Sequence, residues 1–194
     1  MEIDDLLRLI ARAERLEALP RTGWFVCGVQ HPESVASHSY MVALISLALS
    51  ELATAQGLSV DRERLLLIAL VHDLPEAITT DLPRPVKALL GEELCRDAER
   101  DAAAQILSHL PAGHEAYSLY HEGRCLEARL VKAADKIQML AKALQYHHQR
   151  RGAVERFFAV ATWRSDPELE FLTEVFDELR RRYEADDWFV GDFD

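Results

Sequence analysis

Residues 65 to 73 read Leu-Leu-Leu-Ile-Ala-Leu-Val-His-Asp, and this stretch decides the fold. Seven consecutive apolar residues, Leu65 to Val71, favour a helix that is buried on every side by other helices. An imidazole and a carboxylate follow at once, His72 and Asp73, where burial is costly unless the groups are paired, hydrogen-bonded or bound to a cation. On this segment alone, a hydrogen-bonded helix end and a metal site are equally good interpretations.

The sequence on either side of this stretch predicts more helices. Apolar residues recur every three or four positions, Gly and Pro number only 8 and 7, and no convincing alternating pattern is present. We therefore predict an all-α fold. The expected helices cover residues 4–18, 34–57, a segment from Ser59 or Asp61 through Val71, and residues 92–110, 124–150, 153–162 and 167–185, with short helical turns and loops after Pro75.

Length and composition favour one soluble domain. The 194 residues suffice for a single-domain helical bundle around a central buried helix, with its core at about residues 5–145 and C-terminal helices at about 153–185. No apolar run is long enough for a membrane span. The net charge of -11 disfavours nucleic-acid polymers and anionic membranes, so we expect a small phosphate-bearing ligand, met by a local cation or a metal.

The expected compartment is the cytoplasm. Acidic residues, among them Glu2 and Asp4, stand where an export signal would carry positive charge. Cys27, Cys95 and Cys125 lie far apart with no C-x-x-C motif, which predicts reduced cysteines. The sequence therefore indicates neither a disulfide framework nor a zinc–thiolate site.

Two further polar residues interrupt apolar helix faces. His38 precedes the apolar face that begins at Met41, and Asp135 falls among apolar side chains of its own predicted helix. A buried aspartate needs a partner, so either a metal or an arginine must serve it. A mixed nitrogen and oxygen site favours Mn, Fe, Co, Ni or Zn over Ca or Mg. The candidate ligands of one divalent ion are His38, His72, Asp73 and Asp135.

A metal at this place predicts phosphoester hydrolysis. A divalent ion lowers the pKa of a bound water and neutralises charge on a phosphoryl oxygen, which this reaction needs most. Glu76 lies four residues after His72 and three after Asp73, so a continued helical turn places all three on one face. We therefore expect Glu76 to be the general acid or base.

Several motifs in one order resemble a known family. The order His38, His72-Asp73, Asp135 is the H...HD...D signature of the HD-domain metal-dependent phosphohydrolase superfamily. Further segments, over roughly residues 5–145, resemble its 5'-deoxynucleotidase branch. These segments are Leu19–Trp24, Pro32–Val35, His38-Ser39, His72–Ala77, Asp81–Pro83, Pro85–Lys87 and Val131–Asp135. The resemblance implies an HD-type helical bundle, one bound divalent ion, and hydrolysis of deoxyribonucleoside 5'-monophosphates to deoxyribonucleosides and phosphate.

The same resemblance implies roles for individual residues. Glu76 and Asp81 would be catalytic, and Asp81 would also contact substrate. Arg21 would orient the phosphate by a bidentate contact, and Trp24 would line the nucleoside side of the pocket. Thr80 stands where many members carry a glycine.

Two other cations lie close to these motifs in the sequence. Arg84 and Lys87 could also face phosphate, although cations on an exposed loop are more often solvated. We carry both as substrate-binding candidates.

Alternatives remain at this point. The same site could act on a nucleoside triphosphate, a cyclic dinucleotide or an alarmone, but those substrates usually demand extra cations near the metal. A non-catalytic metal-stabilised nucleotide-binding module would have no use for an acid at Glu76. The resemblance favours a homodimer, and the apolar C-terminal helix could either cap the core or form a symmetric contact. Its residues are Phe171, Leu172, Val175, Phe176 and Leu179.

Overall fold

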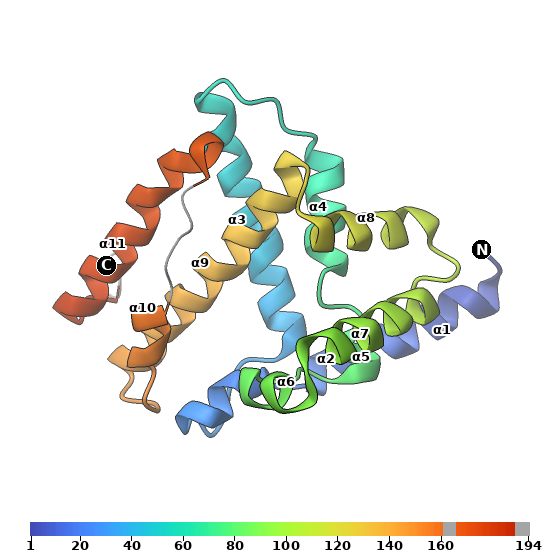
Figure 1. The fold of residues 1–194 in the computed structure, drawn as a ribbon, viewed down its shortest axis with the longest axis horizontal. Helices are drawn as coiled ribbons and strands as arrows, with labels where there is room; N and C mark the ends of the chain where they lie inside the picture. Colours follow the sequence, from blue (N-terminus) through green and yellow to red (C-terminus); the bar gives the residue numbers. More distant parts are fainter. Residues whose placement is uncertain (161–165, 189–194) are drawn as a thin grey trace.

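The computed structural model describes residues 1–160 and 166–188, which form helices joined by short loops (Figure 1). Within these ranges there is no strand, only an isolated antiparallel bridge between Pro20 and Ser34. The all-α prediction is confirmed. The elements are α1 (Ile3–Ala13), α2 (Arg15–Ala18), the 3-10 helix η1 (Thr22–Cys27), α3 (Val35–Ala55), α4 (Arg62–Val71), α5 (Glu76–Thr79), α6 (Arg84–Leu90), α7 (Glu92–Ile106), α8 (Pro111–Glu122), α9 (Leu126–His148), α10 (Glu155–Val160), the 3-10 helix η2 (Pro167–Leu172) and α11 (Thr173–Ala185).

Side-chain caps fix where the two helices that lead to the site begin. The Ser34 hydroxyl accepts a hydrogen bond from the Ser37 amide at 3.1 Å and starts α3. The Asp61 carboxylate accepts one from the Arg64 amide at 3.0 Å and starts α4. Of the two caps that the sequence left open for α4, the structure therefore selects Asp61 rather than Ser59.

Helix α4 lies at the centre of the bundle, packed against α3, α8 and α9 (Figure 1). Leu65 and Ile68 are fully buried, but Leu70 is 59% exposed. The expectation that this helix is buried on every side is thus wrong for one face, because its neighbours leave that face open. The C-terminal end of α4 still delivers His72 into the core, where it is 4% exposed.

Helix α3 has no Asp, Glu, Lys or Arg between Val35 and Ser50. By length and composition it could cross a membrane, with a mean hydropathy of 1.3 over an 18-residue window, a property that no other helix of the described residues has. Core helices of soluble proteins meet the same test, and α3 lies against α4 and α9. The sequence expectation counted unbroken apolar runs, whereas small and hydroxyl side chains extend this uncharged stretch.

Several helix bounds differ from the sequence predictions. The helix expected at 4–18 breaks at Glu14 into α1 and α2, and the one expected at 92–110 ends at Ile106. Helix α8 was not predicted, although Pro111 at its first position is a common helix start. The helix expected at 153–162 covers 155–160, and residues 161–162 lie outside the described residues.

The C-terminal helix caps the core. The segment expected as one helix at 167–185 consists of η2 followed by α11, and α11 packs against α9. Leu172, Phe176 and Leu179 are buried, while Phe171 and Val175 are half-buried against the core. Of the two expectations for this apolar segment, core capping is the one that the structure has.

Candidate active site

The four candidate ligands come from three helices that converge where α4 ends. His38 lies on α3, His72 and Asp73 follow the last residue of α4, and Asp135 lies on α9. One nitrogen or oxygen atom from each of His38, His72 and Asp73 lies within 4.8 Å of the others. Asp135 Oδ1 is 3.3 Å from His38 Nε2. The structure therefore brings together side chains that are up to 97 residues apart in the sequence (135 − 38).

Hydrogen bonds orient both imidazoles toward one point. His38 Nδ1 lies 2.7 Å from Gln138 Oε1, and His72 Nδ1 lies 2.7 Å from the Ala69 carbonyl oxygen. Carbonyl oxygens only accept, so both Nδ1 atoms carry the hydrogen. The two Nε2 atoms then face each other at 3.5 Å, and each is 3.4 Å from Asp73 Oδ2.

Arg21 supplies positive charge to the carboxylates. Its Nη1 donates to Asp73 Oδ2 at 2.9 Å, and its Nη2 lies 3.9 Å from Asp135 Oδ1. Burial alone would raise the pKa of Asp73, but His72, Arg21 and His38 outweigh it and hold that pKa far below its usual range. Burial would also raise the pKa of Asp135, but the hydrogen bond from His38 outweighs it, and the pKa of Asp135 is lowered. Both carboxylates are therefore ionised.

The charge of the carboxylates acts back on His38. Burial and Arg21 lower the pKa of this imidazole, but hydrogen bonds to Asp135 and Asp73 outweigh them and raise it to about 9. A cation at the shared Nε2 position is thus favoured by the surrounding groups, whether it is a proton or a metal ion.

Glu76 lies at the start of α5 with a carboxyl group that has few partners. Its Oε1 is 4.0 Å from Arg21 Nη1, and its Oε2 is buried without a hydrogen-bond partner. Burial raises the pKa of Glu76 to about 9, and the neighbouring Asp73 charge adds to the effect. This carboxyl group therefore holds a proton at neutral pH and lacks a partner for it.

These side chains fit a divalent transition-metal ion. Two Nε2 atoms at 3.5 Å and an ionised Asp73 offer lone pairs to one point, and Asp135 adds a second carboxylate beside it. Imidazole nitrogen with carboxylate oxygen is the donor set that Mn, Fe, Co, Ni and Zn accept. The unpartnered Glu76 Oε2 shows that the group of residues leaves one polar atom for a ligand to satisfy.

Asp81 anchors the loop that carries Arg21. Its carboxylate accepts hydrogen bonds from the Thr22 amide and, at 3.1 Å, from the Thr22 hydroxyl. The same hydroxyl also lies 2.7 Å from the Asp81 carbonyl oxygen, and its single hydrogen can go to either acceptor. Thr80 precedes it with φ 63° and ψ 165°, a backbone conformation that favours glycine. Asp81 is therefore close to Arg21 in space, on a strained turn.

The structure places Trp24 differently from the expectation. Its ring is 3% exposed, packs against Tyr146 and Phe157, and donates from Nε1 to Glu33 Oε1 at 3.2 Å. A side chain buried to this extent has almost no surface to offer a nucleoside. The assignment of Trp24 to the wall of the substrate pocket is corrected, because the ring is buried in the core against Tyr146 and Phe157.

The two loop cations also have separate surroundings. Lys87 on α6 forms an ion pair with Glu99 of α7 at 2.7 Å. Arg84 lies exposed in the first turn of α6. Neither side chain has a contact with the four candidate ligands among the interactions that the described residues make.

Sequence reasoning missed three polar residues next to the ligands. The Tyr120 hydroxyl donates to Asp135 Oδ2 at 3.4 Å, and its ring centroid lies 5.3 Å from that of His72. Tyr120 was missed together with its helix, α8. Gln138 and Glu33 lie behind His38. In the sequence, Gln138 shares the helix stripe of Asp135, and Glu33 falls within the segment Pro32–Val35 that resembles the 5'-deoxynucleotidase branch.

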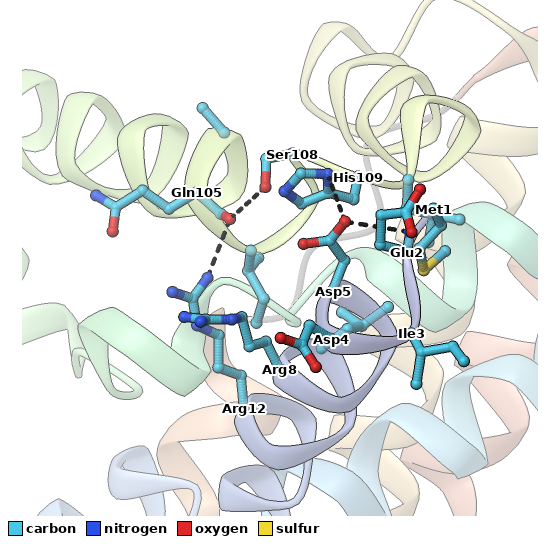
Figure 2. Close-up of a pocket in the computed structure, with 14 residues that line it drawn as sticks. Met1, Glu2, Ile3, Asp4, Asp5, Arg8, Arg12, Gln105, Ser108 and His109 are labelled. Atoms are coloured by element: carbon cyan, nitrogen blue, oxygen red, sulfur yellow. Dashed lines mark hydrogen bonds and ion pairs between the residues drawn. The ribbon is translucent and has the colours of Figure 1, made fainter.

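A wide hollow lies elsewhere, between α1 and the end of α7 (Figure 2). It has a volume of about 980 Å³, and within its lining Asp5 Oδ2 lies 3.2 Å from His109 Nδ1 (Figure 2). Arg12 Nη1 donates to the Gln105 carbonyl oxygen at 3.0 Å. These contacts join α1 to the following helices, and the hollow contains none of the candidate ligands.

A helical bundle that gathers two imidazoles and two carboxylates at the end of a central helix defines a class of metal-dependent hydrolases, and the comparisons agree. Residues 13–175 match the family model described as the HD domain. The chain belongs to the HD domain family.

Relatives and solved structures extend the match over nearly the whole chain. The 5'-deoxynucleotidase HDDC2 of Danio rerio is 32% identical, covering 94% of this chain and 92% of the relative. A 5'-deoxynucleotidase of Vibrio parahaemolyticus is 30% identical, covering 86% and 90%. The structure of a conserved hypothetical protein from Pyrococcus furiosus aligns with a TM-score of 0.78 and 38% identity, covering 90% of this chain and 99% of that one.

Proposed function

We propose that this protein is a metal-dependent phosphomonoester hydrolase that converts deoxyribonucleoside 5'-monophosphates to deoxyribonucleosides and phosphate. The observation that carries the proposal is the convergence of His38 Nε2, His72 Nε2 and the Asp73 carboxylate on one point, with Asp135 beside them. Relatives named 5'-deoxynucleotidase cover most of this chain, which supports the same substrate class.

The metal centre would be formed by His38, His72, Asp73 and Asp135. A divalent ion bound there would lower the pKa of its water and neutralise charge on a phosphoryl oxygen. The ligand chemistry supports Mn, Co, Fe, Ni or Zn.

Arg21 and Glu76, whose side chains lie 4.0 Å apart, would both act on the phosphate. Arg21 contacts Asp73 and Asp135. When a metal ion binds those carboxylates, the planar guanidinium of Arg21 would be free to donate N–H groups to phosphate oxygens. In the metal-free protein burial raises the pKa of Glu76 to about 9, and in the reaction this carboxyl group would donate a proton to the leaving 5' oxygen. Asp81, through Thr22, would keep the Arg21 loop in place and contact the substrate.

The charge around the site suits one phosphate group. Arg21 contacts two of the candidate ligands, Asp73 and Asp135, while Lys87 is paired with Glu99. A triphosphate or a cyclic dinucleotide would bring more negative charge than this arrangement neutralises. Arg84 and Lys87 would at most contact the outer side of the substrate.

A substrate panel tests the proposal. Purified protein with Mn²⁺ or Co²⁺ is given deoxyribonucleoside monophosphates, ribonucleoside monophosphates, a triphosphate and a cyclic dinucleotide, and phosphate release is measured. We expect release from the deoxyribonucleoside monophosphates above all. Preferential hydrolysis of the triphosphate or the cyclic dinucleotide would overturn the substrate assignment.

We also propose that the protein is a homodimer that pairs through α3. Between Val35 and Ser50 this helix has no Asp, Glu, Lys or Arg, yet Tyr40 is 67%, Leu44 49% and Leu47 37% exposed on one stripe. An uncharged stripe on one helix is suited to a two-fold symmetric contact with the same stripe. Light scattering should give a dimer for the wild type and a monomer for Leu44→Glu, with Leu94→Glu on α7 as control. A monomeric wild type would refute it.

A further inference from the structure

Behind His38, a chain of buried polar side chains leads away from the candidate ligands. Gln138 Oε1 lies 2.7 Å from His38 Nδ1, and Gln138 Nε2 donates to Glu33 Oε2 at 2.8 Å. His38 is fully buried, Gln138 is 3% exposed, and the Glu33 side chain is 4% exposed. A polar chain at this depth is tolerated only when each donor meets an acceptor.

Glu33 is surrounded by groups that can only donate. The indole Nε1 of Trp24 donates to Glu33 Oε1 at 3.2 Å, and the Lys142 ammonium lies 3.6 Å from Glu33 Oε2. The Glu33 oxygens accept from these donors, so the side of Gln138 that faces Oε2 is its NH₂ end. The orientation of Gln138 is thereby fixed from behind.

The fixed amide in turn decides which nitrogen of His38 carries a hydrogen. With its NH₂ turned to Glu33, Gln138 presents its carbonyl oxygen to His38 Nδ1, and that oxygen can only accept. Nδ1 therefore bears the hydrogen, and the lone pair of a neutral imidazole lies on Nε2. That atom is the one that faces Asp73, Asp135 and His72.

His72 reaches the same state by a different route. Its Nδ1 donates to the backbone carbonyl of Ala69, which no side-chain substitution removes. A second link starts from Glu33, whose own carbonyl oxygen accepts from the Arg21 amide at 3.0 Å. Glu33 thus holds a candidate metal ligand through its side chain and the loop of the phosphate-binding arginine through its backbone.

We propose that Glu33 and Gln138 are positioning residues that hold His38 in the tautomer whose Nε2 binds the metal ion, and that they thereby set the affinity of the centre for metal. This inference rests on the metal centre proposed above. The side chains of both residues lie outside the proposed ligand set and would act on the metal ion through His38. Partners of this kind typically change metal affinity by about 10- to 100-fold.

Three single variants separate this role from general stability. Gln138→Leu removes the acceptor of His38 Nδ1, and Glu33→Gln leaves one acceptor oxygen where three donors converge. The matched control is Glu127→Gln, which changes a carboxylate of α9 that is 5% exposed and accepts from the Asp61 amide at 3.0 Å. Asp61 starts α4, so this control lies at the end of that helix opposite the candidate ligands.

Two measurements on the full chain test the proposal. The first is Co²⁺ affinity by competition with a chelator; the second is the ¹H–¹⁵N signal of His38 Nδ1–H in Zn²⁺-loaded protein. We expect about 10- to 100-fold weaker Co²⁺ binding and loss of the signal in Gln138→Leu. Glu33→Gln should weaken binding by about 10-fold and shift the signal. Glu127→Gln should lower the melting temperature and leave both readouts unchanged.

The outcomes distinguish failure of this inference from failure of the proposed function. If the wild type binds no Co²⁺, the metal centre itself is refuted. If the wild type binds Co²⁺ and Glu33→Gln matches it in affinity and in the His38 signal, the positioning role is refuted while the centre stands. Glu33→Gln keeps the shape of the side chain, so it decides the question even if Gln138→Leu fails to fold. An equal loss of affinity in Glu127→Gln would also overturn the proposal.

Discussion

The Nε2 atoms of His38 and His72 face each other at 3.5 Å, from residues 34 positions apart in the sequence. A metal ion held between these nitrogens and Asp73 would bind the folded protein and not the unfolded chain, so metal binding should stabilise the fold. We expect Mn²⁺ or Co²⁺ at about 100 times its dissociation constant to stabilise the wild type by about 2.7 kcal/mol. In His72→Ala the metal-induced rise in melting temperature should vanish.

The control for this effect is His31→Ala, because the His31 side chain is exposed and is not a candidate ligand. It should keep the full metal-induced shift. Should His72→Ala keep it as well, the two imidazoles do not share an ion.

Glu76 should be needed for catalysis and not for metal binding. Glu76→Gln keeps the shape of the side chain but cannot donate the proton that burial holds on this carboxyl group at neutral pH. We expect the turnover number to fall by about 10²- to 10⁴-fold. Metal content after dialysis, measured on the same sample, should equal that of the wild type; metal loss would identify Glu76 as a ligand instead.

Arg21 should stabilise the metal-free protein as well as bind substrate. In Arg21→Ala the ionised Asp73 and Asp135 lose their cation, so metal-free protein should lose about 1–3 kcal/mol of stability. Metal should then restore more stability than in the wild type, because the ion replaces the missing charge. Thermal melts with and without Co²⁺ measure this.

Arg15→Ala supplies the matched control, because Arg15 donates to a backbone carbonyl oxygen, that of Ala77 at 3.5 Å, and not to a carboxylate of the candidate ligands. Its melting temperature should respond to Co²⁺ as the wild type does. An Arg21→Ala protein with unchanged metal-free stability would contradict the account of the two carboxylates.

Thr80 should be a site where glycine stabilises the protein. At φ 63° and ψ 165° the threonine backbone is strained, at a cost of about 1–3 kcal/mol. Glycine relieves this strain but loses about 0.5–1 kcal/mol more conformational entropy on folding, so a net gain in stability remains. Thr80→Gly should therefore raise the melting temperature by about 2–4 °C. Thr79→Gly, at the last residue of α5, should lower it. A lower melting temperature for Thr80→Gly would show that the loop has no such strain.

The sequence predicted the helices and the four candidate ligands because both leave local signals. His38 and Asp135 could be found since each is a polar group in an otherwise apolar helix stripe, and His72-Asp73 since it ends an apolar run. That these four residues lie close together could not be predicted from the sequence, because it depends on the packing of α3, α4 and α9 against one another.

Other features had no local signal. The ring of Trp24 is adjacent in sequence to the Arg21 loop, but its orientation is set by Phe157, which lies more than a hundred residues away. Helix α8 was not predicted and Tyr120 was missed with it, although proline, here Pro111, is favoured in the first turn of a helix. The positions of side chains that depend on distant packing partners could not be predicted from spacing.

Phosphate release from a deoxyribonucleoside 5'-monophosphate, measured in metal-loaded, chelated and reloaded samples of the same protein, tests the central claim most directly. The account predicts release with Mn²⁺ or Co²⁺, none after chelation, and recovery when metal is returned, with Asp135→Asn inactive throughout. Release that persists unchanged after complete chelation would contradict it.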